Sequence, residues 1–321
     1  MKYRMSKLER VSAALKGEKV DRPPFSIWYH FGDQHLDGKA HAEIQVNFYR
    51  HYELDFLKVM YDYEFPRPEN LYDIEHKQDW ERLATYNPWE RREFREQIIA
   101  IKEISRKIGS EAYIITTIFS PWTVARNIAY KVFEEHLTKF PEQVLHGLDI
   151  ITTNLERFAA ATIEAGANGI FYSVAGATKD LMTWENYEKF GKPFDLRILH
   201  ASEGAPFNVL HIHGSNVYFE ELLNYPVSAI NWADRDKTNP SLKQARKLTT
   251  TCLMGGIEHL SFKETYLKDV EWQILDAVEQ TTGTGLIVAP GCSVKTNTYE
   301  YQIRNIHSVL ESLVTGKSTG L

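Results

Sequence analysis

The sequence predicts an α/β fold, a single (β/α)8 TIM barrel with an N-terminal helical extension. Short apolar segments of strand type alternate with amphipathic helical segments, a rhythm typical of a parallel sheet. The 321 residues are enough for one such barrel, and no low-complexity linker divides them, so 1–321 is interpreted as one domain. A doubly wound open sheet is the alternative, but the Gly-x-Gly-x-x-Gly turn expected after its first strand is missing.

Eight segments rich in Ile, Val, Phe and Tyr are predicted to be the strands, because turn or polar residues bound most of them. They are residues 24–31, 56–63, 112–119, 169–174, 207–213, 229–233, 252–257 and 286–290. Active sites of (β/α)8 barrels lie at the carboxyl ends of the strands. Polar residues at those ends are therefore the first candidates for a functional site.

Helices are predicted between the strands. The amphipathic segment 89–109 ends on Gly109, and the segment 141–166 begins with Pro141 and ends on Gly166. Residues 241–248 and 266–278 continue the series. At the N-terminus, Ser6 and Glu9 have capping-box spacing before an apolar stripe that Gly17 ends, so a capped helix is expected there.

Composition excludes several classes of function. Hydrophobic residues make up 43% of the chain, which is enough for a sizeable core. The formal net charge of −6 gives no reason to expect nucleic-acid binding. Two cysteines are too few for a disulfide framework, and no apolar run is long enough to cross a bilayer. A cytoplasmic protein without a signal peptide is therefore expected.

The strongest chemical signal combines two histidines and one cysteine. His211 and His213 close one predicted strand, and Cys292 follows the last one. Residues two apart on a strand project to the same side, so both imidazoles should lie together. If Cys292 joins them at the same rim, the three form a zinc site with an open fourth position. The alternative is a hydrogen-bonded histidine pair beside an inert cysteine.

Other strand ends supply further candidates. Asp62 and Glu258 are predicted to be catalytic or to support the metal ligands, although such carboxylates also cap helices. Substrate-binding roles are predicted for aromatic and polar residues at the strand ends, for which the alternative is packing. These residues are Trp28, Tyr29, His30, Tyr172 and Trp232. Cys252 opens a strand and is expected in the core.

Several segments resemble the uroporphyrinogen decarboxylase superfamily across essentially the whole chain. These are "ERVSAALKGEKVDRPPF" near the start, "FSPWTVA" after the third predicted strand, and "GANGIFYSVAGA" followed by "WENYEKFGKPFDLRIL". The resemblance implies a (β/α)8 barrel. It also implies one of two chemistries, metal-free decarboxylation of a porphyrinogen or zinc-dependent methyl transfer, as in the methylcobalamin:coenzyme M methyltransferases.

The resemblance to the methyltransferase branch is carried by the metal-ligand positions. That branch has a His-x-Cys pair after strand five and a cysteine in a Pro-Gly-Cys turn after strand eight. The matching residues here are His211, His213 and Cys292, with histidine at 213 where a cysteine is usual. The zinc ligand is kept, but its charge changes.

The decarboxylase signature is weaker in this chain. True decarboxylases have an arginine-rich segment after strand one, whereas this chain has "IWYHFGDQHL". The tyrosine that follows Pro-Trp-Thr in that branch is replaced by Asn127, which is assigned to substrate binding. Asp62 matches the decarboxylase's catalytic aspartate, but a single aspartate cannot orient a substrate with many carboxylates. The chain is therefore not expected to be a uroporphyrinogen decarboxylase.

The resemblance implies a zinc-dependent methyltransferase that works with a corrinoid protein. The corrinoid is expected on a partner protein, because the chain is interpreted as one barrel domain without a cobalamin-binding domain. One thiolate and two neutral imidazoles leave zinc with a net charge near +1, which slightly favours demethylation of a methyl ether, thioether or amine. The alternatives are a metal-free decarboxylase or lyase acting on a smaller acid, with Asp62 handling the proton, and a non-catalytic barrel that binds a tetrapyrrole or corrinoid.

Overall fold

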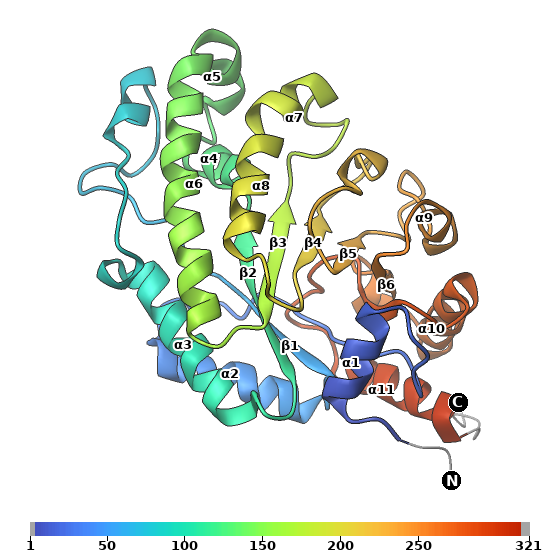
Figure 1. The fold of residues 1–321 in the computed structure, drawn as a ribbon. Coiled ribbons are helices and arrows are strands. Elements are labelled where there is room, and N and C mark those ends of the chain that lie inside the picture. The colour runs from blue at the N-terminus through green and yellow to red at the C-terminus, as the bar shows by residue number, and fades with distance from the viewer. Residues whose placement is uncertain (1–3, 316–321) are drawn as a thin grey trace.

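A computed structural model describes residues 4–315 and contains one seven-stranded parallel sheet in the order β1 to β7 (Figure 1). Each strand pairs with the next strand along the chain, as in a barrel. The strands are β1 (Phe56–Val59), β2 (Tyr113–Phe119), β3 (Gly169–Val174), β4 (Val209–Ile212), β5 (Ala229–Trp232), β6 (Cys252–Ile257) and β7 (Leu286–Pro290). Seven of the eight predicted strands therefore form.

Helices pack around this sheet, most of them on its outer side (Figure 1). They are α1 (Lys7–Leu15), α2 (Gly38–His51), α3 (Arg92–Ile108), α4 (Pro121–Ile128), α5 (Phe133–Lys139), α6 (Pro141–Glu164), α7 (Trp184–Phe190), α8 (Lys192–Ala201), α9 (Leu242–Leu248), α10 (Leu267–Thr281) and α11 (Glu300–Thr315), with short 3-10 turns at Lys77–Arg82, Pro88–Glu90, Glu220–Leu222 and Phe262–Glu264. No helix within residues 4–315 is both long and apolar enough to span a membrane.

Alternation along each strand divides the core into two parts. On β3, Phe171 belongs to the apolar cluster inside the curled sheet, while Ile170 and Tyr172 belong to the cluster between the sheet and its helices. The inner cluster also contains Val11 and Ala14 of α1. This helix carries the expected capping box of Ser6 and Glu9, and it packs against the inside of the sheet.

The first predicted strand, residues 24–31, does not form, which corrects the sequence prediction. Only Phe25 makes a bridge, in parallel with Val288 of β7. On the other side, the Phe25 carbonyl accepts a hydrogen bond from the Asp55 backbone N–H at 3.0 Å. The segment thus lies between β7 and β1 without a regular ladder. Pro23 and Pro24 have no N–H to donate, which shortens any ladder at this point.

The strand predicted over residues 56–63 is also shorter, since β1 ends at Val59. The carbonyl of Met60 accepts its hydrogen bond from the Gln97 side chain at 3.0 Å. Asp62 consequently lies in the connection that follows the strand, beyond the paired residues.

Candidate metal centre

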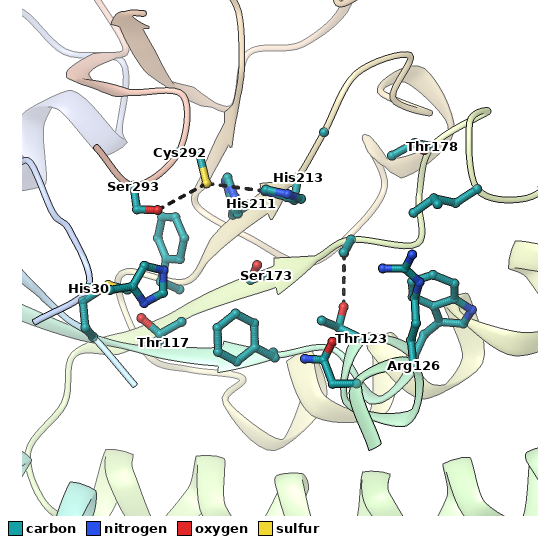
Figure 2. A pocket seen from close by; sticks show the side chains of 18 of the residues that line it. His30, Thr117, Thr123, Arg126, Ser173, Thr178, His211, His213, Cys292 and Ser293 are labelled. Atoms are coloured by element: carbon teal, nitrogen blue, oxygen red, sulfur yellow. Dashed lines mark hydrogen bonds between the residues drawn. The ribbon is translucent and has the colours of Figure 1, made fainter. Parts of the chain in front are cut away.

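His211, His213 and Cys292 come together although 79 residues separate Cys292 from His213. One ligand atom from each side chain lies within 4.8 Å of the others, and the cysteine Sγ is 3.4 Å from Nδ1 of His213. Figure 2 shows the sulfur facing both rings. Tetrahedral zinc, with bonds of ~2.3 Å to sulfur and ~2.05 Å to nitrogen, places two such ligand atoms about 3.6 Å apart. The observed separation therefore fits this metal.

The ring of His211 is oriented by Asn231 of β5. Nδ1 of His211 lies 2.6 Å from the Asn231 side-chain oxygen. The amide nitrogen of Asn231 donates to the carbonyls of Met254 and Pro290, at 2.8 and 3.1 Å, which fixes the oxygen as an acceptor. Nδ1 of His211 must therefore carry the proton. Nε2 is left with its lone pair free to bind a metal.

The electrostatics of the three residues favour a thiolate. Burial alone would raise the pKa of the Cys292 thiol, but hydrogen bonds and charges from His211 and His213 lower it to about 3. The hydrogen bond from Cys292 in turn raises the pKa of His213. A thiolate is the form of cysteine that binds a metal. The donor set is therefore chemically suited to zinc.

These three residues line a cavity of about 480 Å³ inside the sheet. Trp28, His30 and Asn127, which the sequence analysis assigned to substrate binding, also line it. Figure 2 shows His30 at one end and Arg126 at the other. The cavity has the volume and mixed polarity of a small-molecule site.

Tyr29, Tyr172 and Trp232 do not line this cavity, which corrects their predicted position. Tyr172 is fully buried on the outer side of β3, and its hydroxyl donates to Asp195 at 2.6 Å. The indole of Trp232 donates to the Pro240 carbonyl at 2.7 Å. For Tyr172 and Trp232 the reason is alternation, because the adjacent Ser173 and Asn231 point inward. Tyr29 instead packs against the Phe48 ring of α2.

The two predicted carboxylates also lie outside the metal cluster. Asp62 accepts from the His30 ring at 2.6 Å and from two backbone N–H groups. Burial alone would raise the pKa of Asp62, but these partners hold it below its ordinary value. Glu258 accepts from the backbone of Leu260 and from the backbone and hydroxyl of Ser261, so it closes a local turn. Asp62 contacts the cavity lining through His30.

Two residues of the site were missed by the sequence analysis. Asn231 orients a ligand, and its only sequence signal is an amide side chain inside an apolar strand. Lys58 lines the cavity from the middle of β1 with 3% of its surface exposed. Burial lowers the pKa of this lysine to about 7. The sequence signal that could have identified Lys58 is a charged side chain between Leu57 and Val59 in an apolar strand segment. Cys252 is buried as expected, and burial raises its pKa to about 12.

A family model described as uroporphyrinogen decarboxylase (URO-D) matches residues 6–313. The chain belongs to this family. A methylcobamide:CoM methyltransferase, MtbA of Methanosarcina acetivorans, is 24% identical to it over 228 residues, which are 69% of this chain and 64% of that protein. The matched region thus spans somewhat less than two thirds of that relative's length.

Solved structures support the fold. A methyltransferase from Methanosarcina mazei superimposes with a TM-score of 0.79 at 20% identity, covering 96% of this chain and 99% of its own. A putative vitamin-B12 independent methionine synthase from Listeria monocytogenes gives 0.58 at 11% identity, covering 94% and 98%. At these identities the likeness establishes a shared α/β architecture, while function must be argued from the site.

Proposed function

We propose that this chain is a zinc-dependent methyltransferase that moves a methyl group between a small methylated substrate or thiol and a corrinoid held by a partner protein. The observation that carries the proposal is the meeting of His211, His213 and Cys292 in the lining of one cavity. Family membership and the relative named as a methylcobamide:CoM methyltransferase support the same class of reaction.

In this proposal, each side chain has a defined part. His211 binds the metal through Nε2, which Asn231 leaves free, and Cys292 binds as a thiolate. His213 provides the third ligand atom, Nδ1. Bound zinc would supply Lewis acidity to a heteroatom of the substrate at its fourth position. Asp62 holds the His30 ring against the cavity and so positions it toward a substrate.

The direction of transfer is argued from charge. Two neutral imidazoles and one thiolate leave zinc near +1, which stabilises a leaving oxygen, sulfur or nitrogen better than a neutral site does. A fourth protein carboxylate would cancel this charge. The carboxylates of Asp62 and Glu258 are engaged elsewhere, and the metal-ligand cluster found among the described residues contains no acidic group. Demethylation of a small methyl ether, thioether or amine is therefore favoured.

A partner must bring the corrinoid to the cavity. His213 is exposed, so the metal position is reachable from outside. The Asp-x-His-x-x-Gly spacing of corrinoid carriers does occur at residues 33–38, but there Asp37 caps α2 and Asp33 accepts from the His41 ring, so the segment is part of the barrel's own helix start. A corrinoid protein docked where β4 and β7 end would bring its cobalt to the methyl group.

The first experiment measures zinc by elemental analysis in the wild type, in Cys292→Ala and in Cys252→Ala. We expect about one zinc per chain in the wild type and in Cys252→Ala, and none in Cys292→Ala. Cys252 is a matched control because it is a buried cysteine outside the metal cluster. A wild type that neither contains zinc nor takes it up would contradict the proposal.

The second experiment follows methyl transfer through the absorbance of cobalamin. Cob(I)alamin is mixed with methyl ethers, thioethers or amines, and methylcobalamin is mixed with thiols. Chelation should abolish transfer, and added zinc should restore it. Full activity after chelation, or carbon dioxide release that does not depend on Cys292, would point to a metal-free decarboxylase or lyase. Tight corrinoid binding without turnover would instead indicate a non-catalytic barrel.

A further inference from the structure

A second cavity, of about 320 Å³, lies outside the sheet near the carboxyl end of β2. Ile118, which points from β2 toward the helices, lines it together with Val124 of α4 and Leu155 of α6. The connection that follows β1, residues 61–73, supplies much of the remaining wall. This cavity is distinct from the one that contains the metal ligands, which lies inside the sheet.

Aromatic rings form most of the wall, and we call this space the aromatic cavity. The rings of Phe94 and Phe158 stack with centroids 4.6 Å apart and planes tilted by 20°. The Tyr61 ring lies 5.4 Å from that of Phe158, and the Phe65 ring lies 6.1 Å from that of Phe94. A further ring inserted here would find both faces and edges to pack against. The aromatic residues of the lining are Tyr61, Tyr63, Phe65, Phe94, Phe119 and Phe158.

The charged residues of this lining are paired with one another. The guanidinium of Arg67 contacts the Glu64 carboxylate, and it lies 3.2 Å from the carboxylate of Asp73. Both carboxylates are largely exposed to solvent, so the ion pairs lie at the edge of the cavity. A charged ligand would meet an opposite and a like charge together. The lining therefore favours a neutral ligand.

Packing alone does not account for a space of this size. Protein interiors are close-packed, and a void lined by large apolar side chains forfeits contacts in proportion to its volume. Apolar cavities bind small apolar molecules in preference to water. Ligand cavities have volumes from about 300 Å³ upward, so the aromatic cavity is large enough for one ring with a small substituent.

Two residues line both cavities. Phe119, at the end of β2, and Asn127 of α4 contribute to the aromatic cavity and to the cavity of the metal ligands. Asn127 is exposed at this junction, so its amide can donate to or accept from a polar substituent. A ring held between Phe94 and Leu155 could direct such a substituent toward Asn127.

We infer that the aromatic cavity is a second ligand site, which binds a small neutral molecule with one aromatic ring and a polar substituent that meets Asn127. The inference goes beyond the proposed function and does not depend on it, because the site contains none of the metal ligands.

The first test compares three probes of matched shape by fluorine NMR: 4-fluorobenzyl alcohol, 4-fluorobenzoate and 4-fluorobenzylamine. At neutral pH they are neutral, negative and positive. The alcohol should bind saturably and at least about 10-fold more tightly than either charged probe, since a charge without a partner is costly to bury. Absence of saturable binding of the alcohol, or tighter binding of a charged probe, would overturn the inference.

Three phenylalanine variants locate the bound ring. Phe158→Leu removes a ring from the aromatic cavity, and Phe171→Leu removes one from the cavity of the metal ligands. Phe190→Leu is the matched control, because Phe190 is buried but lines neither cavity. Phe158→Leu should weaken binding of the alcohol about 2- to 10-fold, and the other two should not. A loss in Phe171→Leu instead, or an equal loss in all three, would refute the assignment.

A filling variant tests the site even if Phe158→Leu does not fold. Val124→Phe places a ring in the aromatic cavity, so it should abolish binding of the alcohol while the melting temperature is kept or raised. Wild-type affinity in the folded variant would contradict the inference.

Asn127→Ala tests the orientation of the ligand. It should weaken 4-fluorobenzyl alcohol about 2- to 10-fold and leave 4-fluorotoluene, which lacks the hydroxyl, unchanged. An equal effect on both probes would overturn the contact with Asn127.

Discussion

Asn231→Ala should weaken zinc binding although Asn231 is not itself a metal ligand. The substitution removes the 2.6 Å hydrogen bond that keeps the proton of His211 on Nδ1. The ring can then rotate or place its proton on Nε2, and binding the metal must reverse both changes. Loss of such a supporting hydrogen bond costs about 10- to 100-fold in metal affinity, or roughly 1.4–2.7 kcal/mol.

The same change also affects stability. The Asn231 amide spans β5, β6 and β7 through the carbonyls of Met254 and Pro290. Removing both donors should lower the free energy of unfolding by about 1–3 kcal/mol. Zinc affinity must therefore be compared between proteins that are shown to be folded, by circular dichroism and thermal melting.

Asn208→Ala provides the matched control. Asn208 is also a buried asparagine, and it accepts from the Ile170 N–H at 3.0 Å and donates to the Ser202 carbonyl at 3.0 Å. It lies just before β4, whereas His211 lies toward the end of that strand. Competition with a chromophoric zinc chelator gives the dissociation constants. Unchanged affinity in Asn231→Ala, or an equal loss in Asn208→Ala, would refute the reasoning.

Three further predictions concern carboxylates. Burial raises the pKa of Asp234 to about 6 from an ordinary 3.8, so the folded state holds this proton more tightly than the unfolded state, and stability falls as pH rises from about 4 to 6. The free energy of unfolding of Asp234→Asn should therefore rise relative to that of the wild type by up to about 3 kcal/mol across that window. A difference in melting temperature between the two proteins that does not change with pH would contradict this. Glu258→Ala should lower the free energy of unfolding by about 1–2 kcal/mol, because the hydrogen bonds to Ser261 are lost. The zinc content, measured by elemental analysis, should stay the same. A loss of zinc would make Glu258 part of the metal site. Asp62→Asn should keep zinc but lower turnover about 10- to 100-fold, because His30 is no longer held at the cavity; wild-type turnover would remove Asp62 from the mechanism.

Much of the architecture could be predicted from the sequence alone. Seven apolar segments form strands at or near their predicted positions, because strand propensity and bounding turns are local properties. The His-x-His spacing also placed two imidazoles on one side of β4, since alternation on a strand is local geometry. The segment 24–31 failed because pairing depends on donors, and neither Pro24 at its start nor Pro23 just before it supplies one.

Only the tertiary structure decided which residues face the cavity. The strands of a parallel sheet covered by helices are apolar on both faces, so their hydrophobic pattern does not distinguish inside from outside. A shift of one residue exchanges the inward-facing and the outward-facing side chains of a strand. Ser173 therefore faces the cavity, where Tyr172 was expected. Lys58 and Asn231 have the same explanation. Asn231 meets His211 because the register of β4 and β5 sets the two residues side by side, and Lys58 meets Phe171 of β3 because the sheet curls.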